Sequence, residues 1–207
     1  MLLQGSLLDL DEDLHFGPLS GVRRTVLAHQ AWVDHLAGWA SGTTDLFEQL
    51  LETVDWRADK RVMYDRVIEV PRLTRFYREG EPLPHHALEE ARELLSDHYR
   101  HELGERFVSA GMCLYRDARD SVAWHGDREG RAATGDTMVA ILSLGTPRTL
   151  ALRERLGGPT RHRFRLGHGD LVVMGGSCQR TWDHAVPKAS GSLGPRISVQ
   201  FRTRGVR

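Results

Sequence analysis

The chain has 207 residues, of which 40% are hydrophobic and 27% are charged. This composition is ordinary for a globular protein, and the length predicts one domain rather than several. The 28 basic and 28 acidic side chains cancel, which excludes a uniform basic field for holding nucleic acid and leaves only local basic patches open.

The cysteines and the apolar runs bear on the compartment. Cys113 and Cys178 are the only two cysteines, and a chain of this length can bury a core without a disulfide, so we expect reduced thiols. No apolar run approaches the ~20 residues of a membrane span, and the acidic start lacks the basic region of a signal peptide. We therefore expect a soluble, cytoplasmic protein with no membrane contact and no obligate protein partner.

The N-terminal half predicts short strands and two helices. After a loose, partly acidic lead-in over 1–21, residues 22–40 favour short strands. Apolar residues at helical spacing predict a first helix from Asp45, with Glu48 as its capping-box partner. A second helix is expected over 84–99, where Pro84 suits the first turn. Between the helices, 66–77 should form a strand and an exposed loop.

From residue 107 onwards, short β-prone runs alternate with Gly, Pro and Asp. They span 107–115, 121–125, 137–144, 148–153, 161–166, 170–174, 180–186 and 195–203. Strands at this spacing predict an antiparallel sandwich or jelly roll. The expected fold class is α+β, mainly β, with the two N-terminal helices packed outside one sheet. Residues 1–106 would then be an extension of the same domain, and 107–207 its core.

The most informative motif is His125-Gly126-Asp127, with His184 downstream. Residues two positions apart in a strand point to the same side, so His125 and Asp127 can present two ligands to one point. His184 would add a third ligand from another strand. Two histidines and one carboxylate on one face of an iron(II) ion leave the opposite face open, which is typical of non-haem iron oxygenases.

The same tripeptide occurs twice, because His168-Gly169-Asp170 repeats it. A His-x-Asp taken alone is more often a surface histidine beside a solvated aspartate. We assign the second copy to a turn that leads into a strand, since it directly precedes the apolar run 171–174 and lacks an arginine pair at a suitable distance downstream.

Two arginines on the last expected strand, Arg196 and Arg202, suggest a co-substrate. Their spacing of six positions puts both guanidinium groups on one face of a strand. Alone, they would be read as solvated edge charges. Guanidinium groups bind carboxylates through paired hydrogen bonds, so beside an iron site the two arginines indicate a dicarboxylate such as 2-oxoglutarate.

Together these features resemble the AlkB-type iron(II)- and 2-oxoglutarate-dependent dioxygenases, which dealkylate nucleic acids. The resemblance covers about 56–202. It is carried by Leu114-Tyr-Arg-Asp117, His125-Gly-Asp-Arg-Glu129, Ser143-Leu-Gly145, Gly167-His-Gly-Asp-Leu-Val-Val-Met174, Trp182-Asp-His184 and Pro195-Arg-Ile-Ser-Val-Gln-Phe-Arg202. It implies a double-stranded β-helix, which agrees with the strand pattern.

The resemblance also implies roles for individual residues. His125, Asp127 and His184 would hold Fe(II) as the catalytic metal centre. Arg196 would pair with the far carboxylate of 2-oxoglutarate, and Arg202 would lie near its metal-side carboxylate. The remaining co-substrate contacts would come from Tyr115, Ser143 and Ser198.

For the substrate, the resemblance implies a nucleotide-recognition lid over 71–77. Phe76 or Tyr77 would stack on a flipped base, although both are equally consistent with core packing. Arg72 would contact phosphate, and Glu129 would face the exocyclic amine of the damaged base. The alternative is that both side chains are solvated surface charges without a role in binding.

The chain departs from the family pattern at three positions. Cys113 and Ser198 stand where asparagines are common, and Ala118 stands where many relatives have glycine. A thiol is a poor substitute for an amide in hydrogen bonding, which puts the affinity or geometry of the co-substrate in doubt. The metal ligands are unaffected.

The implied reaction is oxidative demethylation of 1-methyladenine or 3-methylcytosine in DNA or RNA, with dioxygen consumed and formaldehyde released. Lesions at pairing positions also lower the cost of flipping the base. Two other interpretations remain open. One is a 2-oxoglutarate-dependent hydroxylase of a protein side chain or small molecule. The other is a non-catalytic jelly-roll binding module with a structural metal.

Overall fold

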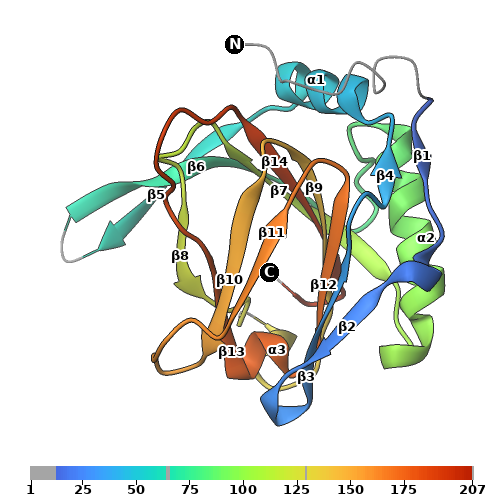
Figure 1. The fold of residues 1–207 in the computed structure, drawn as a ribbon, viewed down its shortest axis with the longest axis vertical. Coiled ribbons are helices and arrows are strands. Elements are labelled where there is room, and N and C mark those ends of the chain that lie inside the picture. Colours follow the sequence, from blue (N-terminus) through green and yellow to red (C-terminus); the bar gives the residue numbers. More distant parts are fainter. Residues whose placement is uncertain (1–12, 64–65, 129, 207) are drawn as a thin grey trace.

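The computed structural model describes residues 13–63, 66–128 and 130–206, and within them two antiparallel sheets dominate (Figure 1). The larger sheet has eight strands in the spatial order β2, β3, β12, β9, β14, β7, β6, β5. In that order they span Arg23–Val26, Ala31–Leu36, Asp170–Gly176, Val139–Gly145, Arg196–Thr203, Phe107–Tyr115, Arg66–Tyr77 and Arg57–Met63.

The smaller sheet has four strands in the order β11, β10, β13, β8. They span His162–Leu166, Arg148–Glu154, Trp182–Val186 and Val122–His125. A separate pair joins β1 (His15–Phe16) to β4 (Ala40–Ser41). The helices of the described residues are α1 (Thr44–Thr53), α2 (His86–Leu103) and the short α3 (Cys178–Thr181), with 3-10 turns at Leu19–Gly21, Ala28–Gln30 and Arg131–Ala133.

Each face of the large sheet is covered by its own hydrophobic cluster, because successive residues of a strand point to opposite faces. Leu142 belongs to the cluster that includes Leu50 of α1 and Leu88 of α2. Its neighbour Ile141 belongs to the cluster that includes Leu152 of the small sheet. Strand β9 is buried on both faces, which explains its nearly unbroken apolar sequence. The small sheet thus lies on one face of the large sheet, and helices α1 and α2 lie on the other.

The prediction of a mainly β chain with antiparallel sheets is confirmed, and each strand expected after residue 107 is found within a few residues of its predicted bounds. The predicted capping box of the first helix is wrong. Its N-cap is Thr43, whose hydroxyl makes no cap hydrogen bond and instead contacts Nε2 of His168 at 2.7 Å.

The expected exposed loop within 66–77 is also wrong, because these residues form one long strand, and its partner β5 was not predicted. The two strands make a hairpin that projects from the body in Figure 1. A register shift in this hairpin between Ala58 and Lys60 lies opposite the stretch that contains Pro71. Proline has no N–H to donate, so it suits such an irregular position within a strand. Beyond it, Leu73 to Tyr77 pair with β7.

No helix in the described part of the chain is long and apolar enough to span a membrane. Cys113 and Cys178 are both free and buried.

Candidate active site

A pocket of about 430 Å³ is lined by both sheets, a size suited to a small ligand. The lining residues come from β6, β7, β9, β12 and β14 of the large sheet and from β8, β10, β11 and β13 of the small sheet. The lining includes the three expected metal ligands, the two arginines of β14, Tyr115 and Ser198. Residues as far apart in the sequence as Arg72 and Arg202 therefore line one cavity.

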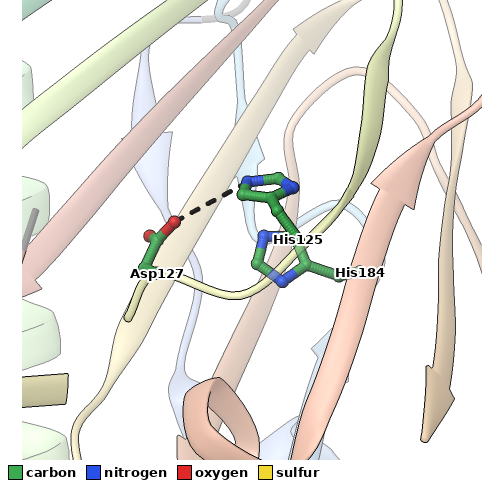
Figure 2. A group of neighbouring side chains, drawn as sticks. All are labelled: His125, Asp127 and His184. Carbon is green, nitrogen blue, oxygen red and sulfur yellow. Dashed lines mark ion pairs between the residues drawn. The ribbon is translucent and has the colours of Figure 1, made fainter. Parts of the chain in front are cut away.

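His125, Asp127 and His184 converge at one side of this pocket (Figure 2). His125 ends β8 and lies opposite His184 in the register of β13, with ring centroids 4.2 Å apart. Asp127 follows β8, and its Oδ1 lies 3.7 Å from Nε2 of His125. One ligand atom from each residue lies within 4.8 Å of the others. The three can therefore reach a common ion.

Burial and hydrogen bonding put these groups in the protonation states that metal binding requires. Burial lowers the pKa of His184 to about 3 and also lowers the pKa of His125, so both rings are neutral near pH 7. Nδ1 of His125 lies 2.9 Å from the carbonyl oxygen of Ala123 and donates to it, which leaves the lone pair of Nε2 free. Burial opposes ionisation of Asp127, but the positive charge and hydrogen bonds of Arg202 lower its pKa.

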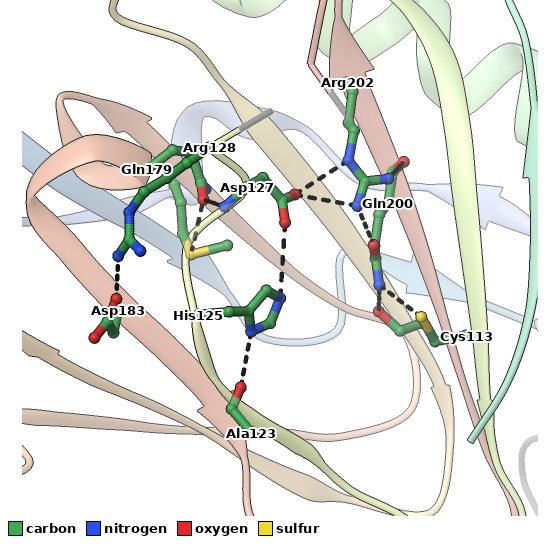
Figure 3. A network of polar contacts seen from close by, with 11 residues as sticks. Cys113, Ala123, His125, Asp127, Arg128, Gln179, Asp183, Gln200 and Arg202 are labelled. Carbon is green, nitrogen blue, oxygen red and sulfur yellow. Dashed lines mark hydrogen bonds and ion pairs between the residues drawn. The ribbon is translucent and has the colours of Figure 1, made fainter. Parts of the chain in front are cut away.

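Asp127 is held from two sides (Figure 3). Its backbone N–H donates to Oε1 of Gln179 at 2.9 Å. Arg202 donates to Oδ2 from Nε at 3.2 Å and from Nη2 at 3.1 Å. A Cβ on Gly126 would come within 2.4 Å of the carbonyl oxygen of Gln179, so only glycine lets the chain pass here. The loop after β8 is thus fixed by α3 and β14.

Arg196 and Tyr115 lie opposite each other on β14 and β7. Arg196 is 2% exposed, and its Nε donates to Oγ of Ser143 at 3.0 Å. Its Nη1 is buried and has no hydrogen-bond partner among the described residues. Burial also raises the pKa of Tyr115 to about 12, so its phenol remains a hydrogen-bond donor. A buried guanidinium with an unmatched N–H calls for an anion from outside the chain.

These residues fit the two groups that the motif indicates. Two neutral imidazoles and one carboxylate on one side of a pocket match the donor set of non-haem Fe(II), with positions left open toward the cavity. The unmatched Nη1 of Arg196 fits a carboxylate.

A family model described as the 2OG-Fe(II) oxygenase superfamily matches residues 35–202. The chain belongs to this superfamily. The three metal-ligand candidates and Arg196 thus fit the Fe(II) and 2-oxoglutarate for which this superfamily is named.

The curated relatives of this chain include AlkB homologues. It is 34% identical over 178 residues to human alpha-ketoglutarate-dependent dioxygenase alkB homolog 3, covering 76% of the chain and 60% of that protein. It is 34% identical over 134 residues to DNA oxidative demethylase ALKBH2 of Arabidopsis thaliana, covering 54% and 42%. The matched region thus spans less than two thirds of the length of each of these relatives.

Solved structures show the same likeness in fold. An oxidoreductase of the 2OG-Fe(II) oxygenase family from Burkholderia pseudomallei superposes with a TM-score of 0.56 at 12% identity, covering 84% of this chain and 86% of that one. A prolyl hydroxylase from Trichoplax adhaerens gives a TM-score of 0.58 at 10% identity, covering 83% and 82%. At such identities the likeness concerns the fold alone.

Of the residues expected to bind substrate, some line the pocket and one lies in the core. Arg72 and Phe76 line the pocket. Tyr77 is 7% exposed and packs in the hydrophobic cluster beneath the helices, so it is a core residue rather than part of the pocket. Glu129 lies outside the described residues.

The structure also locates the two expected serines and the second His-Gly-Asp copy. Ser143 is fully buried behind Arg196, while Ser198 faces the pocket. The second His-Gly-Asp copy is a turn before β12, as predicted. In it Asp170 accepts the backbone N–H of Gly38 at 2.8 Å and of Gly167 at 2.7 Å.

Sequence reasoning missed two glutamines of the site, Gln179 and Gln200. Gln179 is 1% exposed on α3, a helix of one turn that no periodicity indicated. Gln200 lines the pocket between the two arginines of β14. For Gln200 a signal existed, since a residue two positions before Arg202 in a strand must share its face.

Proposed function

We propose that this oxygenase removes N-alkyl groups from bases of DNA or RNA, with 1-methyladenine and 3-methylcytosine as substrates. The observation that carries the proposal is that Arg72 and Phe76 of β6 and the following Arg78 line the same pocket as the metal ligands. Arginines suit phosphates, and an aromatic face suits a flipped base. The names of the relatives, dioxygenase alkB homolog 3 and DNA oxidative demethylase, support the same reaction class.

In this proposal His125, Asp127 and His184 hold Fe(II), and Arg202 keeps Asp127 in place. Arg196 and Tyr115 receive the far carboxylate of 2-oxoglutarate, with Ser143 orienting the guanidinium and Ser198 beside it. When bound, iron and 2-oxoglutarate supply the oxidation, in which dioxygen is consumed, succinate and carbon dioxide form, and a hydroxylated N-methyl group leaves as formaldehyde. The protein itself positions the iron, the co-substrate and the substrate and excludes water from them.

Phe76 is assigned the stacking contact and Arg72 a phosphate contact, since both line the pocket. Glu129 keeps its proposed place against the exocyclic amine, because it follows Asp127 by two positions in the sequence. Tyr77 is given no substrate contact, because it is packed in the core.

The two sheets are proposed to form the double-stranded β-helix of the family, with α1 and α2 outside the large sheet. Residues 1–106 and 107–207 are proposed to be one domain. Support comes from the pairing of β3 with β12 and of β6 with β7 within one sheet. Two free buried thiols favour a reducing compartment such as the cytoplasm, and no obligate protein partner is proposed.

The two rival interpretations are less well supported. Arg72 and Arg78 in the pocket lining are not needed by a hydroxylase of proteins or small molecules. A structural metal site closes its coordination with four ligands, whereas three ligands gather here among the described residues, beside an open pocket.

The test is formaldehyde release by the Fe(II)-loaded protein with 2-oxoglutarate, comparing a methylated oligonucleotide with its unmethylated twin. Formaldehyde from the methylated strand alone, lost in His125→Ala, supports dealkylation. Succinate formation that no methylated oligonucleotide stimulates would refute the nucleic-acid substrate and leave the oxygenase.

A further inference from the structure

Gln200 links the two halves of the pocket. Arg196, Ser198, Gln200 and Arg202 occupy alternate positions of β14 and all line the cavity. The side chain of Gln200 lies between Ser198 and Arg202, as Figure 3 shows for its contact with Arg202. It is the one member of this row to which neither the motif nor the proposed function gives a task.

The orientation of the Gln200 amide follows from its neighbours. Its Oε1 accepts a hydrogen bond from Nη2 of Arg202, and a guanidinium has only donors. The amide nitrogen must therefore face the other way, where it donates to Oγ of Ser198 at 3.2 Å and to Sγ of Cys113 at 3.3 Å. The side chain of Gln200 thus connects Ser198 and Cys113 with Arg202.

Arg202 is enclosed so that its guanidinium has one position. Behind it lie Oε1 of Gln200 and the backbone oxygen of Gln200, which accepts Nη1 at 3.3 Å. A Cβ on Gly111 would come within 2.3 Å of Nη1, so the space beside the guanidinium exists only because residue 111 is glycine. In front, Nε and Nη2 both donate to Oδ2 of Asp127.

This enclosure decides which oxygen of Asp127 faces the histidines. Arg202 occupies Oδ2 with two hydrogen bonds, while Oδ1 points to Nε2 of His125 at 3.7 Å. A carboxylate with one oxygen held in this way offers the other as a single ligand atom, and it leaves more of the metal's positions open.

We infer that Gln200 is a positioning residue that holds Arg202 on Oδ2 of Asp127 and thereby presents Oδ1 to the metal. The inference rests on the metal centre of the proposed function and is independent of its nucleic-acid substrate. The part of Gln200 that matters is the acceptor oxygen toward Arg202.

The test is titration of the metal-free protein with Co(II) alone, followed by the visible absorption spectrum of the bound ion. Gln200→Met has nearly the same shape but no acceptor, and it should weaken Co(II) binding about tenfold, the lower end of the range for groups that orient ligands. It should also alter the spectrum, since the carboxylate is free to rotate. Gln200→Glu keeps an acceptor for Arg202, and its affinity should stay within about threefold of the unaltered protein.

Gln49→Met is the matched control, because it makes the same substitution on the exposed face of α1, and it should change neither affinity nor spectrum. If Gln200→Met does not fold by circular dichroism, Gln200→Asn carries the same expectation, since it shortens the reach by one methylene.

Unchanged Co(II) affinity and spectrum in Gln200→Met would overturn the inference. So would an equal loss in Gln200→Glu, because the acceptor would then be irrelevant. A protein that binds Co(II) as expected but releases no formaldehyde from methylated oligonucleotides would contradict the proposed substrate and leave the role of Gln200 intact.

Discussion

Replacing Arg196 by methionine should affect stability and co-substrate binding in opposite directions. Arg196 is 2% exposed, is bonded to Ser143, and keeps Nη1 without a partner. Burial lowers its pKa, which means that the folded protein disfavours the charge in the absence of an anion. Methionine replaces the apolar stem of arginine and carries no charge, so the protein without co-substrate should be equally stable or more stable.

The loss should appear when 2-oxoglutarate binds. Two hydrogen bonds from a guanidinium to a carboxylate, at about 1.5 kcal/mol each, give about 3 kcal/mol. This corresponds to a dissociation constant raised roughly a hundredfold. The dissociation constant of Arg196→Lys for 2-oxoglutarate should lie between those of the unaltered protein and Arg196→Met, because lysine keeps the charge and loses the paired geometry.

The assay is isothermal titration of the Mn(II)-loaded protein with 2-oxoglutarate in the absence of oxygen, together with a thermal melt of the protein alone. Binding of 2-oxoglutarate to Arg196→Met within threefold of the unaltered protein would refute the assignment of Arg196. A large drop in melting temperature without ligand would refute the argument that its charge is an uncompensated cost.

Three further outcomes follow from the site and its surroundings. Phe76→Ala should lower formaldehyde release from a methylated oligonucleotide tenfold or more, since stacking is worth about 1–3 kcal/mol, and should leave 2-oxoglutarate affinity unchanged; unchanged release would exclude stacking. Asp170→Asn should leave Co(II) binding intact but destabilise the protein by about 1–3 kcal/mol near pH 7 by chemical denaturation. Burial opposes the charge of Asp170, but the nearby His35 ring and hydrogen bonds from Gly167 and Gly38 lower its pKa. The stabilisation is therefore present above the usual aspartate range and lost as pH falls through the lowered value. The stability difference from Asn should vanish in acid, and a pH-independent difference would contradict this. Burial raises the pKa of Cys178 to about 12, so iodoacetamide should fail to modify it in the folded protein at pH 8 and should do so in denaturant, as mass spectrometry would show.

Much of the core could be predicted because its signals are local. Alternation and turn residues gave the strands after residue 107, and the even spacing of Arg196 and Arg202 placed both on one face of β14. The meeting of His125 and His184 depends on a register between β8 and β13 that no local pattern contains, so only the order of the motifs indicated it.

Other features depend on long-range register alone. Phe76 and Tyr77 are neighbours in a strand and must face opposite sides, but the sequence does not say which side is the pocket. The pairing of Phe76 with Gly111 and of Tyr77 with Ala110 decides it. Strand β5 was missed for a local reason: most residues of Arg57–Met63 are charged, so the segment lacks the apolar alternation that indicates a strand.

The two His-Gly-Asp tripeptides show most directly that chemistry here is set by neighbours rather than by the motif. His168 is bonded at both ring nitrogens, to the hydroxyl of Thr43 and the N–H of Gly145, while Asp170 accepts backbone N–H groups and fixes a turn. His125 uses only Nδ1 on the backbone and turns Nε2 to the pocket, and Asp127 has one oxygen held by Arg202. A metal site needs ligand atoms left uncommitted by the fold, and the first copy keeps them where the second does not.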